Sequence, residues 1–84
     1  MSDNPSSIQV LFFSFAADRM NARELTVSIV PGTTTVQDLV EPWLTQLGAP
    51  LNAFMFSVNE EWAHPDTVLS TGDILAVIPP VAGG

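Results

Sequence analysis

The sequence predicts an α+β domain in which one sheet packs against one main helix. The chain has 84 residues, enough for one core and too few for two lobes with a cofactor cleft between them. Segments with the alternation and β-branched content of strands precede and follow a single segment with helical periodicity. No repeat or linker divides the chain, so we expect one domain.

Two strands are expected before the helix. Residues 8–15 (IQVLFFSF) are rich in β-branched and aromatic side chains, which favours a first strand. This strand is apolar on both faces, so it must be covered twice or expose a patch. Residues 16–23 are expected to form a small polar turn, which could include a short helical turn. Residues 24–30 then alternate between polar and apolar side chains, as a half-buried strand does.

One amphipathic helix follows. Thr35 and Asp38 approximate a capping box at its start, and Gly48 supplies the stop. Pro42 lies inside it, where proline removes one hydrogen bond and clashes with the preceding turn, so we expect a kink or a 3₁₀ break. The apolar stripe has helical spacing and is expected to be core rather than a ligand site: Val36, Leu39, Val40, Trp43, Leu44 and Leu47.

The strands after the helix are shorter. Residues 54–58 are expected as the third strand, 59–61 as its turn and 62–63 as the start of a fourth strand. Residues 74–78 (ILAVI) are a continuous apolar run, typical of a central strand. Should this last strand lie beside the first, one of its faces would join the first strand in an apolar patch, and such a patch indicates an interface. Its members would be Leu11, Phe13, Ile74, Ala76 and Ile78.

The last six residues, 79–84 (PPVAGG), are expected to be the functional part of the chain. Pro79 and Pro80 fix φ and extend the backbone. Gly83 and Gly84 have no Cβ and can lie in a slot too narrow for other residues. Such a tail can be threaded into another protein, with Val81 and Ala82 inside the extended segment. A frayed terminus of small residues is the alternative.

The composition excludes several classes of function. The chain has nine acidic side chains and two arginines, which give a net charge of −7. A nucleic-acid partner is therefore not expected. A basic protein partner fits this charge, although acidity that only keeps the domain dissolved fits equally well. The chain has no cysteine and one histidine, so we expect no disulfide, no cysteine nucleophile and no metal site.

No membrane or export segment is expected either. Residues 1–7 are polar and carry no basic region or apolar run, so we interpret them as a flexible extension rather than a signal peptide. No apolar run approaches the roughly 20 residues that span a bilayer. We therefore expect a cytoplasmic protein.

One set of spaced residues resembles a known family. Val58-Asn59, His64-Pro65, Leu69, the run 72–76 (GDILA) and the terminal PPVAGG are similar to the small, sulfur-carrier subunit of molybdopterin synthase, and the resemblance extends from residue 8 onward. It implies a ubiquitin-like β-grasp fold with a mixed sheet at 8–78 and a functional tail at 79–84.

The resemblance also implies a mechanism. An adenylating enzyme related to ubiquitin-activating proteins would use ATP to form an acyl-adenylate on Gly84, and a sulfur donor would convert it to a thiocarboxylate. The tail would then enter the large subunit of the synthase, in a heterotetramer, and pass its sulfur to a pterin precursor. The chain would bind no cofactor and would not be an enzyme alone. The tail and the apolar patch would bind the partners.

Three alternatives stay open. The chain could carry sulfur for another pathway, such as thiamine synthesis or tRNA thiolation, although the Pro-Pro-Val stretch favours the molybdopterin branch. It could be a ubiquitin-like modifier joined through Gly84 to lysines of target proteins. It could also be a scaffold whose tail has no reaction.

Overall fold

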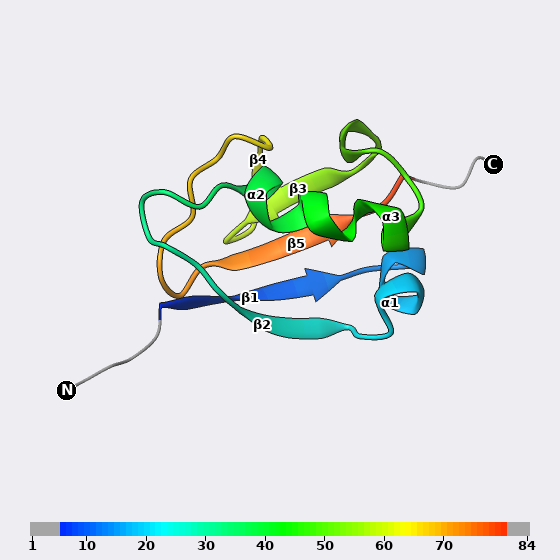
Figure 1. Ribbon diagram of the computed structural model, residues 1–84, viewed down its shortest axis with the longest axis horizontal. Helices are drawn as coiled ribbons and strands as arrows, with labels where there is room; N and C mark the ends of the chain where they lie inside the picture. Colours follow the sequence, from blue (N-terminus) through cyan, green and yellow to red (C-terminus); the bar gives the residue numbers. More distant parts are fainter. Residues whose placement is uncertain (1–5, 81–84) are drawn as a thin grey trace.

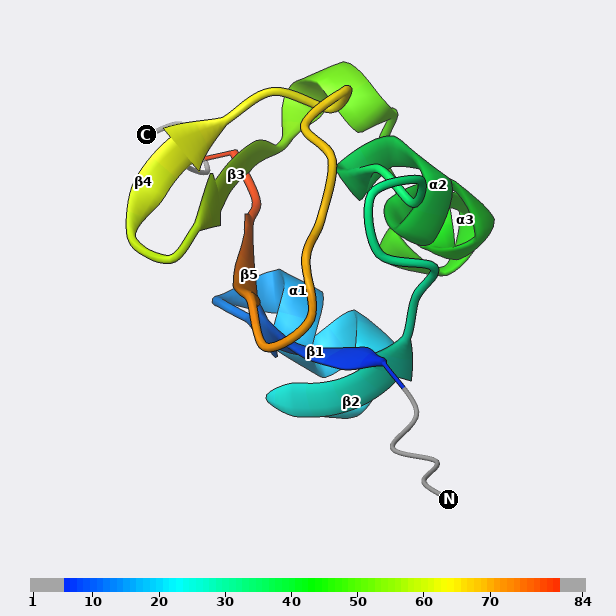
Figure 2. The ribbon, with the colours of Figure 1, turned by 90° about the vertical axis from the view of Figure 1, so that its left-hand side faces the viewer.

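A mixed five-stranded sheet forms the centre of the computed structural model, which describes residues 6–80. The strand order is β2-β1-β5-β3-β4. β1 and β5 pair in parallel, and every other pair of neighbours is antiparallel. The strands curve around α2 and α3, which lie on one side of the sheet (Figures 1 and 2). The strands are β1 (Ser7–Phe12), β2 (Glu24–Ser28), β3 (Met55–Val58), β4 (Glu61–Ala63) and β5 (Ile74–Ile78).

The first strand ends earlier than the sequence predicts. Ser14 has a φ of 53°, which turns the chain out of the sheet, and Phe15 begins a helix, α1 (Phe15–Met20). The prediction of a strand through residue 15 is therefore wrong, because aromatic content favours a strand but does not fix where the backbone turns. After β1, the Phe13 N–H donates one further hydrogen bond to β5, to the Val77 carbonyl at 3.3 Å. The predicted turn over residues 16–23 contains most of this helix, which lies at the end of β1 and beside α3 (Figure 1).

The main helix is interrupted, as the sequence predicts. α2 (Val36–Val40) passes into a 3₁₀ turn, η1 (Glu41–Trp43), and then into α3 (Leu44–Leu47). Pro42 lies in the first turn of η1, a position where its missing N–H costs little. Gly48 has a φ of 78° and ends α3 in the left-handed conformation that glycine allows. A second 3₁₀ turn, η2 (Leu51–Ala53), leads to β3.

The capping box at the start of α2 is confirmed. The Asp38 N–H donates to Thr35 Oγ1 at 3.1 Å, and the Thr35 N–H donates to Asp38 Oδ2 at 3.0 Å. These two bonds satisfy N–H groups that the helix itself leaves without a partner.

We expect Thr35→Ala to lower the free energy of unfolding by about 1 kcal/mol, the usual cost of losing a threonine cap. Urea denaturation followed by circular dichroism measures this change. Thr45→Ala is the matched control because Thr45 is exposed within α3 and makes no cap. Equal unfolding free energies for the two variants would contradict the assigned role of the cap.

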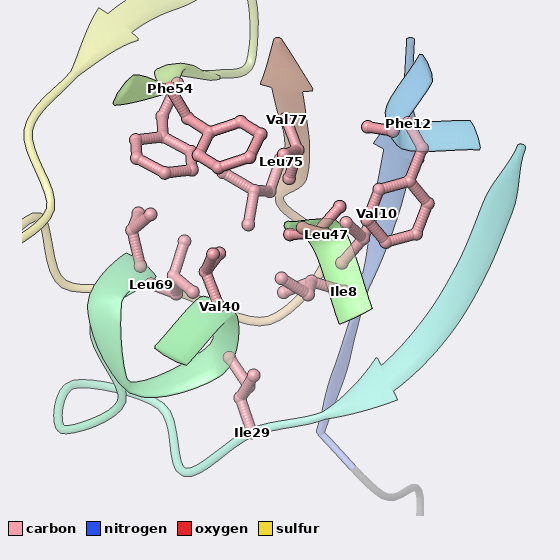
Figure 3. Close-up of a cluster of buried hydrophobic side chains, with 13 residues drawn as sticks. Ile8, Val10, Phe12, Ile29, Val40, Leu47, Phe54, Leu69, Leu75 and Val77 are labelled. Atoms are coloured by element: carbon pink, nitrogen blue, oxygen red, sulfur yellow. The ribbon is translucent and has the colours of Figure 1, made fainter. Parts of the chain in front are cut away.

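The core lies between the sheet and the helices (Figure 3). Leu75 and Val77 of β5 are fully buried and face the helices, so Ile74, Ala76 and Ile78 lie on the other face of this strand. The ring of Trp43 packs edge-on against Phe12, with centroids 5.5 Å apart. The buried cluster is Ile8, Val10, Phe12, Ala16, Ile29, Val36, Val40, Leu47, Phe54, Phe56, Leu69, Leu75 and Val77.

Candidate functional site

The sheet face turned away from α2 and α3 carries an apolar surface. Strand register places Leu11 opposite Ala76 and Met55 opposite Ile78 on this face, while the alternate residues of each strand enter the core. Of the six large hydrophobic side chains exposed within residues 6–80, four lie here, and a concentration of this kind marks an interaction site. We call this surface the open face; it comprises Leu11, Phe13, Met55, Trp62, Ile74, Ala76 and Ile78.

The open face contains a shallow hollow of about 500 Å³. All five apolar residues that the sequence assigned to a patch line it, so β5 does lie beside β1 and brings them together. Three polar residues, Ser57, Asn59 and Glu60, complete its lining. Ala76 lies in the middle of the sheet with only 8% of its surface exposed, so the centre of the hollow has no bulky side chain.

The chain leaves the body where β5 ends. Ile78 is half-buried at the hollow, Pro79 is buried and Pro80 is exposed. The predicted tail residues Val81, Ala82, Gly83 and Gly84 lie outside the described residues. The last described residues of the chain therefore follow directly from the open face.

The turn between β3 and β4 is fixed to the start of β5. The side chain of Asn59 donates to Asp73 Oδ1 at 2.9 Å and accepts from the Ile74 N–H at 3.0 Å. The backbone N–H of Asn59 donates to the Ile74 carbonyl at 2.9 Å. The second turn residue, Glu60, has a φ of 70° and lines the hollow. These bonds hold Glu60 at the turn end of the open face.

The charges around the open face are mainly acidic. Glu24 lies opposite Leu11 at the β2 side and accepts a hydrogen bond from Gln9 Nε2 at 2.6 Å. Glu60 lies at the other side of the hollow. Arg23 lines a neighbouring hollow formed by residues of β1, α1 and β2, whereas Arg19 lies 6.0 Å from the ring of Phe15. A ligand of the hollow therefore meets apolar side chains and a carboxylate.

The described residues show neither a metal site nor a membrane span. Residues 6–80 contain no group of three or more histidine, aspartate and glutamate side chains placed to hold a metal ion. None of their helices is long and apolar enough to cross a membrane. His64 lies at the end of β4, where its N–H donates to Thr67 Oγ1 at 3.0 Å. The geometry of the open face is that of a surface for docking.

Sequence reasoning missed Met55, Trp62 and Glu60 as members of this site. Met55 and Trp62 reach the open face only because β3 pairs with β5 and β4 pairs with β3. The sequence carries a partial signal, since Met55 and Ser57 alternate with Phe54 and Phe56. The sequence does not indicate at which edge of the sheet the third and fourth strands are added.

Comparisons with known proteins find a family match and similar proteins over nearly the whole chain. The model of the ThiS family matches residues 10–84. The molybdopterin synthase sulfur carrier subunit of Arabidopsis thaliana is 32% identical over 87 residues, which cover 99% of this chain and 91% of that protein. Both findings extend over nearly the whole chain.

Solved structures show the same fold. SAMP1, small archaeal modifier protein 1, from Haloferax volcanii is 26% identical with a TM-score of 0.73, over 93% of this chain and 99% of that one. A chain from the complex of subunits 1 and 2 of the molybdopterin-converting factor of Helicobacter pylori is 20% identical with a TM-score of 0.63, over 93% and 99% of the two chains. The predicted ubiquitin-like β-grasp fold, a mixed sheet packed on a helix, is confirmed.

Proposed function

This chain belongs to the ThiS family, and from that premise we propose that it is the sulfur-carrier subunit of a molybdopterin synthase. The observation that carries the proposal is the similarity over nearly the full chain to proteins that are themselves molybdopterin synthase sulfur carrier subunits. A sulfur-carrier role in molybdenum cofactor synthesis follows from this similarity. The identity of the reacting group and of the partners is proposed on the basis of this role.

We propose that the carboxylate of Gly84 is the group that receives sulfur. A free α-carboxylate has a pKa of about 3.5, so at neutral pH it is ionised and reacts poorly with a sulfur nucleophile. Its oxygen would first attack the α-phosphorus of ATP, releasing pyrophosphate and leaving an acyl-adenylate. Sulfide delivered by a sulfur donor would then attack the acyl carbon and release AMP, leaving a thiocarboxylate. ATP belongs to the adenylating partner, and this chain binds no cofactor of its own.

The body of the protein has the task of presenting the tail. The open face would lie against the partner, and the tail would enter the partner's pocket from the end of β5. Residues 79–84, extended at about 3.3 Å each, would reach roughly 15 to 20 Å beyond that end. The large subunit would bind the pterin precursor and receive the thiocarboxylate sulfur, within a heterotetramer. A complex of subunits 1 and 2 in the Helicobacter pylori protein supports such a partner.

Reconstitution tests this proposal directly. The chain is incubated with the adenylating enzyme, ATP and a sulfur donor, and its intact mass is measured. We expect a gain equal to the difference between a sulfur and an oxygen atom, located at Gly84 by fragmentation. Adding the large subunit and the pterin precursor should then yield molybdopterin and return the mass to its starting value. Loading without transfer to the pterin precursor would contradict the assignment to this synthase.

A modifier role is the second candidate because of the likeness to small archaeal modifier protein 1. A modifier would be found joined by isopeptide bonds to lysines of other proteins, whereas a synthase subunit would be found free or loaded with sulfur. Immunoblots of the tagged chain from cells separate the two roles, since conjugates form ladders of higher mass. A carrier for thiamine synthesis or tRNA thiolation would instead load with sulfur and restore those products in a deletion strain.

We expect Ala76→Arg to weaken binding to the large subunit at least about 100-fold, equivalent to roughly 2.7 kcal/mol. Ala76 lies at the centre of the hollow, between Leu11 and Ser57, and a long charged side chain there would hold the two surfaces apart. Isothermal titration calorimetry measures the affinity. Val68→Ala is the control because Val68 is exposed beside Thr35, away from the open face. Wild-type affinity for Ala76→Arg would remove the open face from the docking surface.

A further inference from the structure

We propose that Glu60 and Trp62 form a cation-binding end of the open face, which receives an arginine side chain of the large synthase subunit. The carboxylate of Glu60 would pair with the guanidinium, and the indole of Trp62 would stack on it. This inference rests on the proposed function because it names the chemistry by which that partner is recognised. It adds to the apolar hollow a contact that depends on charge.

The position of Glu60 is fixed by the structure. Asn59, the residue before it, makes three hydrogen bonds to Asp73 and Ile74. Asp73 is itself held, because its Oδ2 accepts from the Ser70 N–H at 2.8 Å. The carboxylate of Glu60 therefore extends from a constrained turn at the edge of a hollow that it helps to line. A partner that fills the hollow therefore meets the turn from which this carboxylate extends.

The backbone of Glu60 supports a functional role. Asn59 and Glu60 both have positive φ, at 53° and 70°, and the chain passes through them directly from β3 to β4. At the second position of such a two-residue hairpin turn, glycine is the favoured residue. Glutamate there gives up stability that glycine would provide, and strain of this kind is concentrated at binding and active sites. The turn thus holds a carboxylate beside the hollow at the expense of stability.

Trp62 is the second residue proposed to contact the guanidinium group. It is 69% exposed, more than any other large hydrophobic side chain within residues 6–80, and it lies opposite Ser57 on the open face. Glu60 precedes it by two residues and lines the hollow on the same face, whereas Trp62 lies beside that hollow and lines a separate one with Met55. Aromatic rings bind guanidinium groups by stacking and by cation–π attraction, and a carboxylate binds the same group through two parallel hydrogen bonds.

The charges of the chain favour a basic partner over a second copy. The net charge is −7, and Arg19 and Arg23 are the only arginine or lysine residues in the sequence. A second copy could therefore offer two arginines, of which Arg19 already lies over the ring of Phe15. A partner surface that is positive beside the hollow would complement the charge of this chain, and opposite fields favour docking.

The test measures the affinity of the full chain for the large subunit by calorimetry at several salt concentrations. We expect Glu60→Gln to weaken binding about 5- to 20-fold and to reduce its dependence on salt, because one charge pair is lost. Trp62→Ala should weaken it about 10- to 50-fold, as expected for an aromatic anchor. Glu61→Gln is the matched control, since Glu61 lies opposite Val58, on the side of the sheet that faces the helices, and it should change affinity less than about twofold.

Glu60→Gly separates docking from folding. Relief of the backbone strain should raise Tm by about 3 to 6 °C in a domain of this size, while affinity falls as much as in Glu60→Gln. A purely structural role for Glu60 predicts unchanged affinity in both variants, and that result would overturn the inference.

Other outcomes also decide the matter. If Glu60→Gln and Trp62→Ala lose affinity for the adenylating enzyme alone, that enzyme is the partner of this contact and the inference is overturned. If light scattering shows that the chain self-associates and that Trp62→Ala abolishes this, the partner is a second copy and the inference is overturned as well. A wild-type chain that binds the large subunit, with Glu60→Gln and Glu61→Gln unchanged, overturns this inference and leaves the proposed function in place. A wild-type chain that does not bind the large subunit overturns both.

Discussion

Removing Gly84 is expected to abolish molybdopterin formation and leave the folded body unchanged. The proposed function places the reacting carboxylate on this residue, and a chain ending at Gly83 would present its carboxylate one residue short of the partner's reacting groups. A shift of this size in the position of reacting atoms is costly, since even 1 Å can reduce a rate 100-fold. We expect a loss of at least about 1,000-fold in product, equivalent to about 4 kcal/mol of activation free energy.

The measurement for this deletion is product formed in the reconstituted system, with the intact mass recorded in parallel. The free energy of unfolding should change by less than about 0.5 kcal/mol, because the core is built from residues between Ile8 and Val77. Val68→Ala serves as the active control. Product formation at the wild-type level by the shortened chain would refute the assignment of Gly84 and favour a scaffold whose tail does not react.

Leu75→Ala is expected to lower the free energy of unfolding by about 2 to 5 kcal/mol. Leu75 is fully buried, on the central strand, opposite Val10 on one side and Val58 on the other. Truncation loses the transfer free energy of the side chain and leaves a cavity that the surrounding strands cannot close. Because small domains are stable by only about 5 to 15 kcal/mol, this single change should unfold a large fraction of the protein in mild denaturant.

Chemical denaturation measures the effect of Leu75→Ala. Its control is the neighbouring substitution Ile74→Ala, which affects a side chain 41% exposed on the open face and should cost less than about 1 kcal/mol. A similar loss of stability in both variants would contradict the assignment of the two faces of β5.

The sequence predicted the arrangement of the body well because its signals were periodic. The helical spacing from Val36 to Leu47 predicted a stripe that packs in the core, with a break near Pro42. Each of these features depends on residues a few positions apart. Local chemistry and packing agree there, which is the condition under which sequence reasoning succeeds.

The remaining features depend on the backbone at single residues or on pairing between distant strands. The end of β1 was misplaced because Ser14 adopts a positive φ that serine does not favour. The part of the open face formed by Met55 and Trp62 could not be predicted, because their location depends on β3 lying next to β5. The five-residue patch was predicted because only one pairing, that of β1 with β5, was needed to form it.

The pairing of the first strand with the last has a consequence for synthesis and degradation. Without β5, the hairpin of β1 and β2 and the hairpin of β3 and β4 have no strand pairing between them. Two-stranded hairpins alone are marginal in water, and the contacts that unite them span almost the entire chain, which makes assembly cooperative. A nascent or clipped chain that lacks β5 therefore lacks the strand that joins the two hairpins, and with it the open face.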